Sequence, residues 1–176
     1  MEAFHRLVEK GKVRALGASN FDTWRIAQAN MIAEHKGETP FTVMQQRLTY
    51  LHPNYPQAPA YAFNEICNRE RLRYLCDKNM PLVSYACLCK GGYEVPERLP
   101  TEYVGGKRLE LIRTLAAEKG VNPSALVIAW LTNLYRCEGF PRVIPLFSAT
   151  PARLLDNFCG LELALTDEEL ELMNRA

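Results

Sequence analysis

Short apolar runs alternate with longer stretches of mixed polarity along the whole chain. Each run is nearly continuous in hydrophobic residues, which is typical of strands in a parallel sheet that is covered on both faces. The longer stretches between them have the length and spacing of helices. This alternation predicts βα units with four strands, over residues 13–17, 41–45, 81–88 and 142–146.

Capping residues mark the ends of several predicted helices. Asp22 can cap a helix that Gly37 ends, and Pro123 follows Asn122 as a first-turn proline follows a cap. Residues 166–169, Thr-Asp-Glu-Glu, form a capping-box pattern at the start of the last helix. Helices are predicted over residues 2–9, 22–34, 64–78, 107–119, 122–135 and 151–158, and from 166 onward.

Two of these helices arrange their apolar residues differently. The helix over residues 122–135 is apolar nearly all round, as expected of a helix that packs between neighbours. The helix over residues 22–34 gathers apolar side chains on one face: Trp24, Ala27, Met31 and Ile32.

Two segments between the predicted elements are expected to be long loops. They are the proline-rich stretch LHPNYPQAPAYAF, residues 51–63, and residues 89–106.

The length of 176 residues and the hydrophobic content of 48% suit one domain, so we expect residues 1–176 to form a single α/β unit. Four parallel strands can be half of an eight-stranded barrel or a small open sheet, and the periodicity fits both.

Charge and cysteine usage exclude several function classes. The 21 basic and 20 acidic residues are mixed along the chain, so nucleic acid and acidic membrane surfaces are not expected partners. No apolar run is long enough to span a bilayer, and the first ten residues do not resemble a secretion signal, which predicts a cytoplasmic protein. The six cysteines form no C-x-x-C pair, so we expect no metal site and mostly reduced core thiols.

Polar and aromatic residues gather where the predicted strands end. In both architectures ligands bind at the carboxyl ends of parallel strands. An amide, a hydroxyl and an aromatic face at one rim could recognise a flat ring that carries a carboxamide. Each residue also has a plainer interpretation, as a turn, a cap or a core side chain. The residues at these four ends are Ser19, Asn20, Gln45, Gln46, Arg47, Tyr85, Ala86, Phe147, Ser148 and Thr150.

The fourth strand end differs because it leads into the segment SATPARLLDN. Ser148 and Thr150 precede a short helix whose backbone amides would attract a phosphate, and Arg153 adds a permanent positive charge one turn later. Thr150 before Pro151 is also an ordinary helix opening. The segment therefore predicts either a phosphate site or a plain helix start.

Taken together, these motifs resemble those of the aldo-keto reductase family. The segments GKVRALGASNF, VMQQRLTYLHP, LVSYACL, VIPLFSATPARLLDNF and LALTDEELELMN follow the order and spacing of its C-terminal half, strands five to eight of the barrel. The most specific parts are GKVR-x-x-G-x-SNF and the closing Arg-x-x-Asp-Asn. The resemblance implies half of a (β/α)8 TIM barrel from an oxidoreductase that uses NADP(H) to reduce an aldehyde or ketone.

The resemblance also implies roles for individual residues. Ser19, Asn20 and Gln45 match the residues that hold the nicotinamide carboxamide of the cofactor. Tyr85 matches the aromatic residue that stacks on the nicotinamide ring, with Ala86 and Leu88 beside it. The adenosine end of NADP(H), with its 2′-phosphate facing Arg153, is expected at Ser148, Thr150, Arg153, Asp156 and Asn157.

The chain departs from the family pattern at three points. Ala86-Cys87 replaces the usual Ser-Pro after the stacking tyrosine, and Leu146-Phe147 replaces the Lys-Ser of some members. The family's catalytic Asp, Tyr, Lys and His come from its first four strands, and neither His5 nor His52 matches that histidine by position. The resemblance therefore implies no catalytic residue in this chain and negligible hydride transfer by the chain alone.

Three functions remain open at this point. The chain could be the cofactor-binding half of a carbonyl reductase, a non-catalytic nucleotide-binding or interaction module, or a truncated reading frame without a function of its own. Because half a barrel leaves two open edges and an uncovered inner face, we expect a homo-oligomer, pairing with a complementary N-terminal half, or poor folding. The loop aromatics could line a substrate pocket or lie on the surface: Tyr55, Tyr61, Tyr93 and Tyr103.

Overall fold

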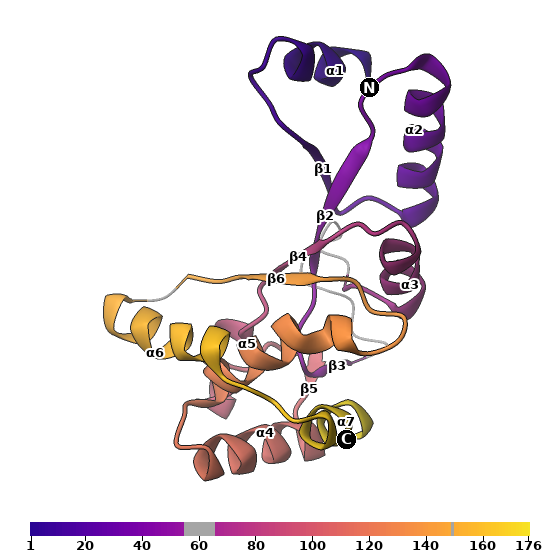
Figure 1. The fold of residues 1–176 in the computed structure, drawn as a ribbon. Helices are drawn as coiled ribbons and strands as arrows, with labels where there is room; N and C mark the ends of the chain where they lie inside the picture. The colour runs from indigo at the N-terminus through magenta and orange to yellow at the C-terminus, as the bar shows by residue number, and fades with distance from the viewer. Residues whose placement is uncertain (55–65, 149) are drawn as a thin grey trace.

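A parallel sheet of four strands runs through the molecule. The computed structural model describes residues 1–54, 66–148 and 150–176. All neighbouring pairs in the sheet are parallel, which confirms the predicted α/β class. The strands lie in the order β1 (Leu16–Ser19), β2 (Phe41–Arg47), β4 (Leu82–Tyr85) and β6 (Val143–Leu146) (Figure 1).

A small antiparallel pair, β3 (His52–Pro53) with β5 (Tyr103–Val104), joins two loops beside the main sheet.

Helices follow or precede the strands of the main sheet, as the sequence predicts. No helix in the described residues is long and apolar enough to cross a membrane. The α-helices are α1 (Glu2–Glu9), α2 (Thr23–Lys36), α3 (Arg69–Asp77), α4 (Gly106–Glu118), α5 (Pro123–Asn133), α6 (Pro151–Glu162) and α7 (Asp167–Arg175). The short 3-10 helices are η1 (Cys89–Gly91), η2 (Pro96–Arg98) and η3 (Leu134–Arg136).

The predicted caps are present with one exception. The Asn122 side chain accepts a hydrogen bond from the α5 backbone at 2.7 Å. The capping box is complete, because Thr166 and Glu169 each accept from the other's backbone amide. Gly37 ends α2 in the left-handed conformation, with φ 67°. Asp22 precedes α2 as predicted, but its side chain makes no capping hydrogen bond.

Several boundaries differ from the prediction for local reasons. The β1 strand begins at Leu16, because the backbone amide of Val13 is still bonded to the Leu7 carbonyl at the end of α1. Asn68 caps α3 through its side chain, so that helix begins later than the predicted residue 64, which lies outside the described residues. The strand predicted to continue to residue 88 ends at Tyr85.

The core of the molecule is built around α5. All residues from 124 to 131 are buried, and α5 contacts α4, α6, α7 and β6, as its uniformly apolar sequence predicts. The approach of α6 to α5 is so close that a Cβ on Gly160 would overlap the carbonyl oxygen of Ala125. Glycine at this position therefore lets α6 pack directly on the α5 backbone.

One face of the sheet is open, as expected of half a barrel. Because side chains alternate along a strand, Val83 and Ile144, which are in register, lie on the same face. Ile144 is 53% exposed and Leu146 is 48% exposed on this face. Apolar side chains that would fill the interior of a complete barrel thus lie in contact with solvent.

The apolar face of α2 is largely exposed. Trp24 is 63% exposed and Met31 is 64% exposed, and Ile32 is also exposed. The side chains that α2 does bury are Thr23, Ile26 and Ala33, which lie on another side of the helix. The residues with the greatest apolar area therefore face away from the sheet.

Candidate functional site

Asn20 is the centre of a hydrogen-bonded cluster at the carboxyl ends of β1, β2 and β4. It adopts a left-handed conformation, with φ 56°, a region that asparagine tolerates better than most residues. Its backbone amide donates to the Gln46 side chain at 3.2 Å, and the Gln46 amide donates back to Asn20 Oδ1 at 3.2 Å. The Tyr85 hydroxyl donates to the same Oδ1 at 3.0 Å, while Asn20 Nδ2 donates to Ser19 Oγ at 3.3 Å. The structure thus brings together three of the predicted site residues, Ser19, Asn20 and Tyr85.

The fourth predicted member of this group, Gln45, lies on the other side of β2 from Gln46. Gln45 is in register with Ser19 and half-buried toward the open face, whereas Gln46 is fully buried. Sequence reasoning placed Gln46 at this rim without giving it a role. Side chains alternate along a strand, so the two glutamines lie on opposite faces of β2. This alternation is the sequence feature that could have distinguished Gln46 from Gln45. Gln46 supports Asn20 through two hydrogen bonds, and Gln45 lies on the open face of the sheet.

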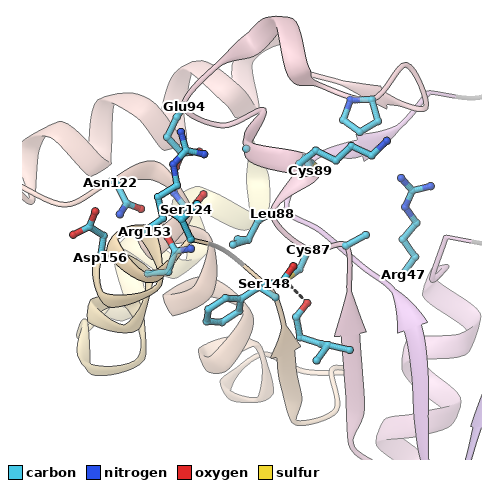
Figure 2. Close-up of a pocket in the computed structure, with 18 residues that line it drawn as sticks. Arg47, Cys87, Leu88, Cys89, Glu94, Asn122, Ser124, Ser148, Arg153 and Asp156 are labelled. Carbon is cyan, nitrogen blue, oxygen red and sulfur yellow. Dashed lines mark hydrogen bonds between the residues drawn. The ribbon is translucent and has the colours of Figure 1, made fainter.

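The other predicted residues line a cavity between the β4 and β6 ends and the first turn of α6. Its volume is about 460 Å³, within the range of ligand sites. Figure 2 shows Arg153 and Glu94 on one side of this cavity and Arg47 on the other. Ser19, Asn20, Gln45 and Tyr85 are not among the residues that line it. Those predicted residues that do are Ala86, Leu88, Ser148, Thr150, Arg153, Asp156 and Asn157.

The loop after β4 has an unusual backbone. Ala86, Cys89 and Lys90 all have positive φ angles, of 52°, 47° and 55°. Each such residue costs on the order of 1–3 kcal/mol and persists only where the surrounding structure holds it. The first of these residues, Ala86, directly follows the last residue of β4, Tyr85.

Thr49 anchors this loop through its side-chain hydroxyl. Its hydroxyl lies 2.5 Å from the Cys87 carbonyl oxygen and 2.5 Å from the Tyr93 hydroxyl, and all three residues are buried. Sequence reasoning gave Thr49 no role. Tyr93 and Tyr103 are both buried and are not among the residues that line the cavity, whereas Tyr55 and Tyr61 lie outside the described residues.

The Cys87 thiol lines the cavity but is unsuited to act as a nucleophile. Burial raises its pKa to about 12, and its Sγ contacts the Leu146 carbonyl oxygen at 3.6 Å. Burial also raises the pKa of Cys89. Both thiols therefore stay protonated at neutral pH, because the thiolate is disfavoured in an apolar environment.

Arg47 borders the cavity but is paired within the protein. Its guanidinium donates to Glu102 at 2.9 Å, both side chains are buried, and the Tyr103 ring centroid lies 5.1 Å away. The Glu102 carboxyl accepts a hydrogen bond from the Glu102 backbone and lies beside Arg47. Both interactions hold the pKa of this carboxyl below its usual range, against the opposing effect of burial. The pair fastens the long loop after β4 to the sheet.

The two histidines considered for catalysis have structural partners. His5 Nδ1 lies 2.9 Å from the Thr39 hydroxyl. His52 Nε2 lies 3.3 Å from Arg108, and burial and this arginine lower its pKa. Neither histidine lines the cavity.

The donor groups present fit a nicotinamide dinucleotide. Lys90 and Arg153 supply positive charge to the cavity, and Ser148 and Thr150 supply hydroxyl groups, which together suit phosphate oxygens. The amide of Asn20 at the neighbouring strand ends suits a carboxamide. The arrangement can therefore bind an extended ligand with a planar polar end and an anionic end.

Comparisons with known proteins find related sequences along nearly the whole chain. Norsolorinic acid reductase stcV of Emericella nidulans is 27% identical over 180 residues, covering 97% of this chain and 42% of that protein. The aryl-alcohol dehydrogenase of Phanerodontia chrysosporium, whose name specifies NADP(+), is 24% identical, covering 99% of this chain and 46% of that protein. The chain spans about half the length of the curated relatives that it matches along its whole length.

Solved structures show the same arrangement of elements. Aldose reductase from Giardia lamblia superposes with a TM-score of 0.65 at 22% identity, covering 99% of this chain and 48% of that one. An aldo/keto reductase from Brucella melitensis gives a TM-score of 0.63 at 21% identity, with 99% and 52% covered. The four βα units thus have the fold of part of the (β/α)8 barrel of these enzymes. A sequence model of the aldo/keto reductase family matches residues 1–176, and the chain belongs to that family.

Proposed function

We propose that residues 1–176 are the cofactor-binding, C-terminal half of an NADP(H)-dependent reductase of aldehydes or ketones. The order of the strand-end motifs supports this assignment, as does the chain's coverage of about half of each full-length relative. In this proposal the chain is one unit of a barrel that a complementary N-terminal half or a second copy completes. The open sheet face with Ile144 and Leu146 is consistent with such a partner.

The observation that carries the proposal is the hydrogen-bonded cluster at Asn20 beside a cavity with a cationic wall. Asn20 Oδ1 is held by Gln46 and Tyr85, which fixes how the amide is turned. The amide NH2 then lies toward Ser19 at the open side, where a carboxamide oxygen could accept from it. The ring of Tyr85, anchored through its hydroxyl, offers a flat surface next to that position.

The preference for NADP(H) over NAD(H) rests on Arg153. This side chain lines the cavity near the start of α6, and a guanidinium is well suited to bind a phosphate through two parallel hydrogen bonds. The Phanerodontia relative carries NADP(+) in its name, which supports the same choice.

When bound, the cofactor would supply the hydride, and this chain's residues would bind and orient it. The family's catalytic Asp, Tyr, Lys and His have no assigned counterpart in residues 1–176. A positioned general acid contributes typically about 10²–10⁴-fold to such a reaction. We therefore expect the chain alone to bind NADPH without reducing a carbonyl compound.

A fluorescence titration of the chain with NADPH tests the proposal. Saturable binding is expected, and Asn20→Asp should weaken it about tenfold, because the substitution removes the amide donor while keeping size and tolerance of the left-handed backbone. Gln28→Glu makes the same chemical change on an exposed part of α2 and should leave affinity unchanged. Absence of saturable binding by the wild-type chain would contradict the proposal.

Turnover separates a reductase half from a non-catalytic nucleotide-binding module. Adding an aryl aldehyde to the NADPH-loaded chain should leave the cofactor absorbance unchanged. Adding an N-terminal half-barrel that carries the Asp, Tyr, Lys and His should start NADPH consumption. Stable assembly with that half and continued lack of consumption would favour the non-catalytic module.

A further inference from the structure

A second cavity lies at the opposite ends of the strands from the site described above. It is formed by the end of α3 with the loop that leads into β4, and by η3 with the loop that leads into β6. Because these loops precede the strands, the cavity lies at the amino ends of β4 and β6. Its volume is about 430 Å³, which is within the range of small-molecule sites.

Backbone hydrogen bonds fix the two loops that form this cavity. The amide of Met80 donates to the Leu75 carbonyl at 2.8 Å, directly after the end of α3. The amide of Leu82 donates to the Arg142 carbonyl at 2.8 Å, which joins the loops at the starts of β4 and β6. Both loops are thus bonded to a helix or to the sheet. The cavity is therefore built on well-anchored backbone.

The walls of the cavity are apolar and aromatic. Leu75 and Met80 are buried core residues that line it, and the partly buried Phe140 packs against the same core. Tyr135 also lines the cavity but is 47% exposed, so much of its ring is open to solvent. Aromatic rings pack favourably against other rings, so Phe140 and Tyr135 suit a planar ligand.

Arg142 is the only charged residue among the described residues that line the cavity. The carbon atom at the centre of its guanidinium lies 4.9 Å from the centroid of the Tyr135 ring, a cation–π distance. Within residues 1–54, 66–148 and 150–176, this guanidinium makes no hydrogen bond or ion pair. By contrast, Arg47 at the other end of the sheet is paired with Glu102. The N–H groups of Arg142 are therefore available to an anionic ligand.

We propose that this cavity binds a small aromatic carboxylate, with its ring against Tyr135 and Phe140 and its carboxylate on Arg142. A guanidinium can bind a carboxylate through two parallel hydrogen bonds, and the aromatic walls favour a planar apolar body. This inference goes beyond the proposed function and does not rest on it, because the two cavities share no lining residue in the described part of the chain.

Calorimetric titration of the chain with 1-naphthoate tests the site. Saturable binding with a Kd below about 1 mM is expected. Arg142→Gln should weaken it about five- to tenfold, because a charge-assisted contact is lost at an exposed position. The neutral analogue 1-naphthamide should bind the wild type and Arg142→Gln equally. The matched control is Arg113→Gln on α4, also exposed, which should bind naphthoate as the wild type does.

Alkylation of cysteines by iodoacetamide locates the bound naphthoate. Cys76 lines this cavity and is partly exposed, whereas Cys159 on α6 is exposed and does not line it. Saturating 1-naphthoate should slow alkylation of Cys76 and leave that of Cys159 unchanged, as measured by mass spectrometry of the peptides. At the same naphthoate concentration, Arg142→Gln should show less protection of Cys76.

The outcomes separate this inference from the proposed function. Failure of the wild-type chain to bind 1-naphthoate overturns the inference alone, because NADPH binding is measured independently. Equal affinities of Arg142→Gln and Arg113→Gln for naphthoate also overturn it. Binding that leaves Cys76 unprotected, or that NADPH displaces, overturns it because the naphthoate would then lie elsewhere. Thermal unfolding followed by circular dichroism should give Arg142→Gln the wild-type midpoint.

Discussion

Helices α5 and α2 both cover strands of the same sheet, yet they bury their apolar side chains very differently. The α5 helix is buried over residues 124–131 and is enclosed by three other helices and β6. The α2 helix exposes Trp24 and Met31, although its sequence has an apolar face. In Figure 1, α1, β1 and α2 lie at one end of the molecule, away from α4 and α7.

The difference shows that an apolar face is buried only where a neighbour exists to cover it. Around α5 the chain supplies every neighbour itself. Around α2 the chain supplies β2 and, through a hydrogen bond from Thr23 to Glu70, the start of α3, and α1 buries none of its residues. Because exposed apolar area costs about 25 cal/mol per Å², the N-terminal end is where we expect further βα units or a second copy to bind.

The largest expected effect is at the most tightly packed contact. Gly160→Ala should destabilise the chain by about 3 kcal/mol or more, because the new methyl group meets the Ala125 carbonyl oxygen, which belongs to a rigid helix. The measurement is urea unfolding followed by circular dichroism. The neighbouring exposed Cys159→Ala is the control and should shift stability by less than about 0.5 kcal/mol. Equal midpoints for the two variants would show that α6 does not pack closely on α5.

A smaller loss is expected when the buried ion pair is broken. Glu102→Ala leaves Arg47 buried without its carboxylate partner, which should cost about 2–4 kcal/mol of unfolding free energy. Glu97→Ala, in the same loop but exposed, should cost almost nothing. Replacing both members of the pair, as Arg47→Met with Glu102→Leu, should recover most of the loss. A Glu102→Ala variant as stable as Glu97→Ala would mean that the pair does not fasten the loop.

The same pair predicts a dependence of stability on pH. The Glu102 pKa is lowered in the folded chain, so its contribution is present above the unfolded value, about 4.3, and is lost as pH falls through the folded pKa. Thermal midpoints of the wild type should therefore fall on acidification below that value. Glu102→Gln should start lower and fall less over the same range. Parallel curves for the two proteins would assign the acid sensitivity to other carboxyl groups.

The smallest effect is expected at the exposed end. Trp24→Ser should change the stability of the isolated chain by less than about 0.5 kcal/mol, because this side chain is 63% exposed. Leu131→Ala, in the buried helix, should cost about 2–5 kcal/mol. Sedimentation velocity on the same samples would show whether Trp24 belongs to an interface, since its loss should then shift an associated species toward monomer. A core-like loss of stability in Trp24→Ser would contradict the exposed position of this side chain.

The sequence by itself determined the order and type of the elements and several of their ends. The alternation of apolar runs, the Asn122 cap, the Thr166–Glu169 box and Gly37 act over one or two turns of chain, so they are visible in the sequence. The strand-end motifs also pointed to residues that the structure gathers around Asn20 and around the cavity. Their roles toward a cofactor stay predictions.

Only the tertiary structure decided which side chains meet and which faces are covered. Asn20 is hydrogen-bonded to Gln46 and Tyr85, which are 26 and 65 residues away in the sequence. The tertiary structure likewise decided which side chains of α2 are buried and which are exposed. Local patterns carry no information about such pairs, because contacts between distant segments depend on how strands register and which neighbours are present.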